Sequence, residues 1–118
     1  MRFVVRSHLG LAAVAAGLIL GSAAAFAADA GKGKAAFMKY GCWQCHGTVG
    51  QGSPVTGPKL APNPMPYDAL SAFIRNSNRA MPPYKEAVLP ESDLQDIYAY
   101  LSSIPAAPDP KSIPLLNE

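Results

Sequence analysis

The sequence has 118 residues, two cysteines and two histidines, with ten Lys and Arg side chains against eight Asp and Glu. A chain of this length holds one small domain, near the lower limit of what a hydrophobic core alone stabilises, so a bound cofactor or metal would help it fold. The near balance of charge excludes the strong overall basicity that is typical of nucleic-acid-binding proteins.

Residues 1–27 have the pattern of a signal peptide. Arg2 and Arg6 give a positive start, the run LGLAAVAAGLILGSAAAFAA carries no charge, and residues 25–27 supply the small-x-small motif that signal peptidases cleave. We expect cleavage near Ala27 and a periplasmic mature protein. The alternative is a retained single-span anchor, for which the uncharged run is long enough. Cleavage leaves 118 − 27 = 91 residues with eight basic and eight acidic side chains, so the predicted mature chain is formally neutral.

A short helix is predicted over residues 33–40, with Phe37 facing the core. Directly after it lies Cys42-Trp43-Gln44-Cys45-His46, which holds every cysteine and histidine of the predicted mature chain. Positions three apart on a helical turn share a face, so both thiols can reach one edge of a porphyrin. C-x-x-C-H is the attachment signature of c-type haem. In this interpretation, Cys42 and Cys45 form thioethers with the haem and His46 ligates its iron.

Three other uses of this Cys-x-x-Cys-His motif fit the sequence less well. A disulfide between its cysteines would close too short a loop to stabilise the fold much. A redox-active pair would want a thioredoxin-like βαβ setting, and no strand-rich pattern surrounds it. A tetrahedral zinc site needs further Cys or His ligands, which the predicted mature chain lacks. One covalently attached haem c is therefore the predicted cofactor.

The second axial ligand of the iron is expected to be a methionine, because no second histidine remains and methionine commonly partners histidine at haem iron. Met38 lies too close to the motif to reach the opposite face. Met65 and Met81 both precede a proline, which favours extended loops, and residues 66–76 predict an amphipathic helix between them. Met81 lies 35 residues after His46 and has room to pass round the porphyrin edge. We predict Met81 as the ligand, with Met65 or an open, water-filled site as alternatives.

The remaining chain predicts one more helix and a tail. Residues 46–65 are rich in Gly, Pro and Thr and predict a long loop wrapped on the cofactor. Ser92 predicts an N-cap, and the apolar positions after it predict an amphipathic helix that ends before Pro105: Leu94, Ile97, Leu101 and Ile104. Residues 105–118 (PAAPDPKSIPLLNE) predict an extended, proline-rich C-terminal extension. With no strand pattern, the predicted fold is all-α, with three or more helices around one haem in a domain of residues 28–104.

These features resemble class I (monohaem) cytochromes c over most of residues 31–104. Besides the Cys-x-x-Cys-His motif and the downstream Met-Pro, residues 56–60 (TGPKL) are similar to the family's T-G-P-x-L loop. The resemblance implies a small class I cytochrome c fold. It also implies that the Pro58 carbonyl accepts a hydrogen bond from Nδ1–H of His46, a contact that fixes the ring tautomer and raises ligand basicity.

The resemblance further implies that the first and last helices cross through a glycine and an aromatic residue. Gly33 and Phe37 match this pattern in the first helix, and Ile97 and Tyr100 match it in the last. The small glycine would let the two backbones approach closely, which is a packing role.

Residues 75–84 (RNSNRAMPPY), together with residues 100–106 (YLSSIPA), are most similar to cytochrome subunits that accept electrons from periplasmic dehydrogenases, such as the small subunit of the flavocytochrome p-cresol methylhydroxylase. This similarity implies a one-electron carrier and not an enzyme. A periplasmic dehydrogenase, a flavoprotein in that example, would be the electron donor, and another redox protein the acceptor. The alternative function is a haem enzyme or small-ligand sensor with an open distal site.

Three further side chains have two interpretations each. Arg75 and Arg79 are predicted either to pair with haem propionates or to be solvated surface charges. Trp43 is predicted either to be an apolar docking contact for a redox partner or to lie against the haem rim.

Overall fold

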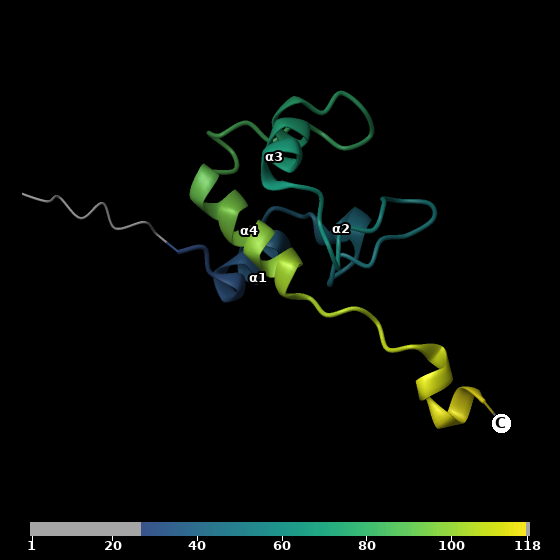
Figure 1. Cartoon of the computed structure of the whole chain (residues 1–118). Helices are drawn as coiled ribbons and strands as arrows, with labels where there is room; N and C mark the ends of the chain where they lie inside the picture. The colour runs from purple at the N-terminus through teal and green to yellow at the C-terminus, as the bar shows by residue number, and fades with distance from the viewer. Residues whose placement is uncertain (1–26, 118) are drawn as a thin grey trace, which may run out of the picture.

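The structure is a computed structural model and describes residues 27–117. The predicted signal peptide, apart from Ala27, lies outside these residues. The described chain folds into four α-helices and two 3₁₀ turns (Figure 1): α1 (Ala30–Lys39), α2 (Trp43–His46), α3 (Tyr67–Asn76), α4 (Glu91–Ser103), η1 (Pro110–Ser112) and η2 (Pro114–Leu116). Residues 27–117 contain no strand, so the predicted all-α fold is confirmed. Within the same residues, no helix has the length and hydrophobicity needed to cross a membrane.

The first and last long helices, α1 and α4, cross at close range (Figure 1). A Cβ at Gly33 would lie 1.8 Å from the carbonyl oxygen of Asp96, so only a glycine fits between the two backbones. One turn further along α1, the fully buried ring of Phe37 packs against that of Tyr100, with 5.7 Å between their centroids. The predicted crossing is confirmed, and Asp96 adds a close backbone contact to it.

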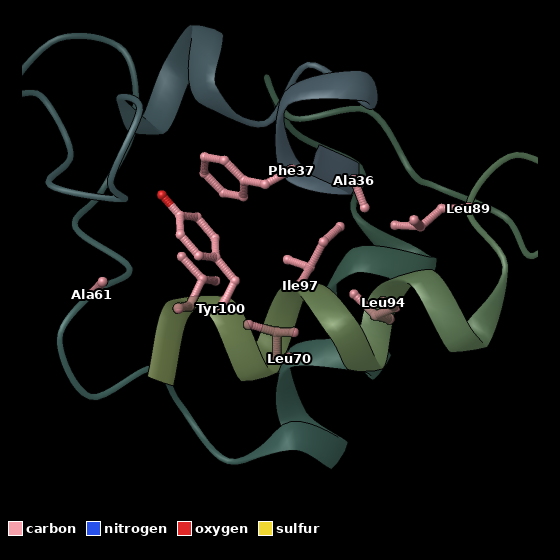
Figure 2. Packing of buried hydrophobic residues seen from close by; sticks show 9 residues of the cluster. Ala36, Phe37, Ala61, Leu70, Leu89, Leu94, Ile97 and Tyr100 are labelled. Carbon is pink, nitrogen blue, oxygen red and sulfur yellow. The ribbon is translucent and has the colours of Figure 1, made fainter. Parts of the chain in front are cut away.

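The hydrophobic core lies around this crossing and extends to α3 and two loops (Figure 2). Its most completely buried large side chains come from α1, from the loop before α4, and from α4 itself: Phe37, Leu89, Leu94 and Leu101. α3 contributes Leu70, and the loop after the Cys-x-x-Cys-His motif contributes Ala61. The core therefore ties α3 and both long loops to the α1–α4 pair. Burial of apolar surface is the main stabilising contribution to such a domain.

Two predicted helix starts are wrong by two to three residues. α1 begins at Ala30 and not at Gly33, because the Asp29 side chain accepts a hydrogen bond from the backbone N–H of Lys32 and caps the helix. α4 begins at Glu91, with Pro90 and not Ser92 at the N-cap. Ser92 is an exposed residue of the first turn. α3 begins and ends within one residue of its prediction.

The sequence predicted an extended conformation for the whole C-terminal extension, but the structure shows two short turns within it. After α4 the chain runs away from the helices and then forms η1 and η2 (Figure 1). The Asp109 side chain caps η1, and the Asn117 side chain donates to three carbonyls of the preceding turns, those of Pro110, Lys111 and Ile113. Asx side chains form such local turns readily, which explains the difference from the predicted conformation.

Candidate functional site

The Cys-x-x-Cys-His motif forms one tight helical turn. Gly41, at φ 77°, lets the chain change direction after α1. Cys42 precedes α2, and its carbonyl accepts a hydrogen bond from the backbone N–H of His46 at 3.1 Å. The two cysteines are not joined in a disulfide. Cys42 is half-buried and Cys45 is exposed, and burial raises the pKa of the Cys42 thiol to about 11.

The imidazole of His46 is buried and held by the following loop. Its Nδ1 lies 2.7 Å from the carbonyl oxygen of Pro58, the contact that the resemblance implied. A carbonyl can only accept, so Nδ1 carries a proton, and in the neutral ring Nε2 then has the lone pair that a metal-ligating histidine requires. A ring held in this way has a defined tautomer and orientation.

The loop that holds His46 is packed directly onto it. A Cβ at Gly57 would lie 3.1 Å from both Cε1 and Nδ1 of the His46 ring. The hydroxyl of Thr56 donates to the carbonyl of Cys45 at 2.8 Å. Sequence reasoning included both residues in the TGPKL match but did not assign them these contacts. They clamp the loop over the turn that carries the histidine.

The predicted methionine ligand lies on a separate segment. Met81 is half-buried in the loop between α3 and α4, and its carbonyl accepts a hydrogen bond from the buried Ser77 hydroxyl at 2.7 Å. Met65, the alternative ligand, is 47% exposed, and Met38 is 38% exposed on α1. Met81 is thus the most enclosed of the three methionines of residues 27–117.

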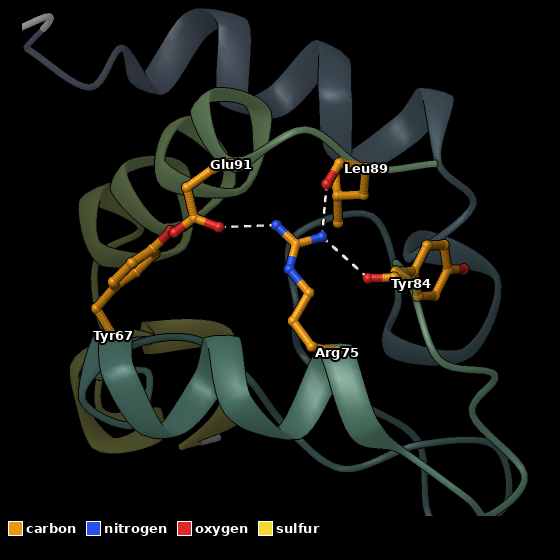
Figure 3. Close-up of polar contacts among 5 residues, drawn as sticks. All are labelled: Tyr67, Arg75, Tyr84, Leu89 and Glu91. Carbon is orange, nitrogen blue, oxygen red and sulfur yellow. Dashed lines mark hydrogen bonds and ion pairs between the residues drawn. The ribbon is translucent and has the colours of Figure 1, made fainter. Parts of the chain in front are cut away.

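Arg75 has protein partners that the sequence did not indicate (Figure 3). Its guanidinium donates to the carbonyls of Tyr84 and Leu89, at 2.9 and 2.5 Å, and pairs with the Glu91 carboxylate at 2.8 Å. Its side chain is 13% exposed, so the prediction of a solvated surface charge is wrong for Arg75. Three of the five N–H groups of a guanidinium are engaged in this way. A propionate would have to use the remaining two. Arg79 is exposed, as a solvated charge would be.

Glu91 is also bound by a second side chain. The hydroxyl of Tyr67 donates to it at 2.5 Å. Burial, and then the hydrogen bond to Glu91, raise the pKa of Tyr67, whereas Tyr67 and then Arg75 lower the pKa of Glu91. The proton therefore stays on the tyrosine and the negative charge stays on the carboxylate, facing Arg75. No periodicity or motif in the sequence pointed to this trio.

The first cysteine of the motif lies at the edge of the hydrophobic core. Cys42 packs beside the core together with the partly buried side chains of Leu60, Ile74 and Tyr84. Trp43 is 39% exposed next to it, which is compatible with either of its two predicted roles. The Tyr84 hydroxyl donates to the carbonyl of Tyr40 at 3.0 Å, which places the loop of Met81 beside the segment leading into the motif.

The donor set fits a c-type haem. Two free thiols share one turn, a buried imidazole keeps one ring nitrogen for a metal, and a methionine lies on a loop that packs beside the same turn. Residues 27–117 offer no cluster of three or more His, Cys, Asp or Glu side chains that could hold a metal ion directly. Two surface hollows, of about 430 and 260 Å³, lie between α1 and α4 and beside the start of the C-terminal extension. Neither is lined by a residue of the motif.

Comparison with known proteins agrees with this site. Neither a curated protein nor a solved structure matches the chain. A family model does match it over residues 28–101, and this family is described as cytochrome C oxidase, cbb3-type, subunit III. The match spans the whole Cys-x-x-Cys-His motif, the Pro58 loop and nearly all of α4. The chain therefore belongs to this family of cytochrome c domains, and it is a haem-based electron carrier with a monohaem, class I-like cytochrome c domain.

Proposed function

We propose that the protein is a periplasmic one-electron carrier in which Cys42 and Cys45 attach a single haem c, and His46 and Met81 ligate its iron. The observation that carries this proposal is the 2.7 Å contact between Nδ1 of His46 and the Pro58 carbonyl. It leaves Nε2 as the free donor of a buried ring, one residue from Cys45. When bound, the haem supplies an iron that gains and loses one electron.

The protein would allow electron transfer at the iron without a change in its ligands. His46 is held by Pro58, and Met81 by the Ser77 hydroxyl at its own carbonyl, so both are restrained before and after transfer. With His46 and Met81 both holding the iron, no coordination position would remain for a substrate. Cys42 packs against the apolar core, and apolar surroundings would favour the reduced iron, which carries less positive charge than the oxidised iron.

The proposed location and partners rest on the sequence. The signal-peptide pattern of residues 1–27 supports export to the periplasm, followed by release of a mature chain that begins near Ala28. The similarity of residues 75–84 to dehydrogenase cytochrome subunits, including that of p-cresol methylhydroxylase, supports a periplasmic dehydrogenase as donor. A second redox protein would be the acceptor. The match to a family named for an oxidase subunit makes an oxidase the competing partner.

Mass spectrometry and spectroscopy of the exported protein test the haem and its ligands. The expected mass is that of residues 28–118 plus one haem that resists extraction under denaturing conditions. The ferric form is expected to show the weak sulfur-to-iron charge-transfer band of methionine ligation. Met81→Ala should abolish the band, and Met65→Ala should retain it as the matched control.

Three results would overturn parts of the proposal. A mass equal to the bare chain would remove the haem, and a mass that includes residues 1–27 would replace release by a retained anchor. Rapid binding of carbon monoxide to the reduced wild type, without the charge-transfer band, would favour the open-site enzyme or sensor. Co-purification with an oxidase and no dehydrogenase would replace the proposed partner.

A further inference from the structure

The loop between α3 and α4, residues 77–90, carries Met81 and is held by one charge network centred on the mostly buried Arg75 (Figure 3). Arg75 projects from the last turn of α3 and binds the loop at two of its carbonyls, those of Tyr84 and Leu89. The same guanidinium pairs with Glu91 at the start of α4, and the Tyr67 hydroxyl at the start of α3 binds that carboxylate from the other side. One side chain thus links both helices to the second half of the loop.

Two further hydrogen bonds attach the loop to the end of α3 near Arg75. The backbone N–H of Tyr84 donates to the Ile74 carbonyl at 2.9 Å, and the Lys85 ammonium donates to the carbonyl of Arg75 at 2.8 Å. Toward the first half of the loop, the Met81 carbonyl accepts only the Ser77 hydroxyl among the hydrogen bonds of the described residues. The position of Met81 therefore depends on how firmly the segment from Tyr84 to Leu89 is held.

Loss of the guanidinium would leave its hydrogen-bond partners without a donor, and the cost would differ between them. Leu89 is 1% exposed and its carbonyl would lose its charged donor, which is costly for a buried acceptor. Glu91 is partly exposed and can regain water. The cost would therefore fall on the loop, and it can be relieved by opening the loop and moving Met81 away, with α3 and α4 intact.

We infer that Arg75, oriented by Glu91 and Tyr67, is a positioning residue that holds the Met81 loop closed over the haem iron. This inference rests on the proposed ligation by Met81. With the loop closed, Met81 would hold the iron, and each opening of the loop would let a competing ligand bind in its place. The apparent affinity for an added ligand therefore measures the open population.

Imidazole titration of the ferric holoprotein tests the inference. Arg75→Gln is expected to lower the apparent dissociation constant for imidazole about tenfold, the equivalent of losing one charge-assisted hydrogen bond. Glu91→Ala, which removes only the orienting carboxylate, should lower it about threefold. Glu86→Gln removes an exposed charge from the same loop and should leave the constant unchanged. Arg75→Lys keeps the positive charge but not the planar guanidinium, so it should lower the dissociation constant by less than Arg75→Gln does.

A double variant separates positioning from general damage. In the Met81→Ala background the loop has no ligand to hold, so adding Arg75→Gln should not change imidazole affinity further. An effect of the same size in that background would overturn the inference, as would unchanged affinity in both Arg75→Gln and Glu91→Ala. If Arg75→Gln gives no folded holoprotein by circular dichroism, Glu91→Ala decides alone.

The same measurements distinguish failure of the proposed Met81 ligation from failure of the proposed role of Arg75. A wild type without the charge-transfer band, or one that binds imidazole as tightly as Met81→Ala, shows that Met81 is not the ligand. A wild type with the band and with Arg75 and Glu91 variants of unchanged affinity shows that Met81 is the ligand and Arg75 does not position it.

Discussion

The backbone of α4 passes so close to Gly33 that a Cβ there would lie 1.8 Å from the carbonyl oxygen of Asp96 and 2.9 Å from the Cβ of Tyr100. The nearest atoms are backbone and a helical Cβ, which cannot rotate away. The approach brings Phe37 and Tyr100 into contact and sets the distance between the helices that frame the candidate haem site.

Gly33→Ala is expected to destabilise the holoprotein by at least about 1–3 kcal/mol, because the helices must separate to accept the methyl group. Chemical denaturation followed by circular dichroism measures the change. Gly31→Ala is the matched control in the same helix, since its Cβ would meet only the Asp29 side chain, at 3.2 Å. Equal stability of the two variants would contradict the observed crossing.

Tyr100 also joins α4 to the loop after the motif, because its hydroxyl donates to the Thr48 carbonyl at 2.8 Å. Tyr100→Phe keeps the ring contact with Phe37 and removes this hydrogen bond, so we expect a loss of about 1 kcal/mol in the free energy of unfolding. Tyr98→Phe is the control, because the Tyr98 hydroxyl makes no hydrogen bond within residues 27–117. A larger loss in the control than in Tyr100→Phe would rule out this role of the Thr48 contact.

Gly57→Ala should shift the reduction potential. Its Cβ would press on Cε1 and Nδ1 of His46 and weaken the hydrogen bond to Pro58, which makes the imidazole a poorer donor to Fe(III). We expect the potential to rise by about 20–60 mV, the one-electron equivalent of roughly 0.5–1.4 kcal/mol. Redox titration of the variant beside wild type and Gly31→Ala measures it, and an unchanged or lower potential would speak against the mechanism.

We expect the contribution of the Glu91 carboxylate to protein stability to be lost at acid pH. Hydrogen bonds from Tyr67 and Arg75 hold its pKa below the ordinary value of 4.5. A depressed carboxyl pKa contributes stability above the ordinary pKa and loses it as the pH falls through the folded value. Glu91→Gln removes this titration, so wild type should exceed it in stability at neutral pH and lose that advantage below pH 4.5. The difference should be about 1 kcal/mol or less, because 40% of the Glu91 side chain is exposed.

Urea unfolding of both proteins across this pH range provides the measurement. Comparing the two proteins cancels acid effects that both share. A difference that grows as the pH falls would have the wrong sign for this account.

The local features were predicted well from residues near one another in the sequence. The turn of the Cys-x-x-Cys-His motif follows from spacing, and α3 and α4 follow from apolar periodicity, with ends correct to within two residues. The contact between Pro58 and His46 joins residues only 12 positions apart, and the resemblance to class I cytochromes c implied it. The start of α1 was missed because Asp29 was not recognised as its cap.

Sequence alone determined the chemistry of this protein: two thiols and one imidazole on a single turn, within a chain able to form amphipathic helices. The tertiary structure decided what holds that chemistry in place. Arg75 can reach the loop carbonyls and Glu91 only after α3, the loop and α4 have packed, and Gly33 meets Asp96 only once helices 63 positions apart have crossed. Such contacts depend on the packed positions of distant backbone groups, which leave no periodicity and no motif in the order of the residues.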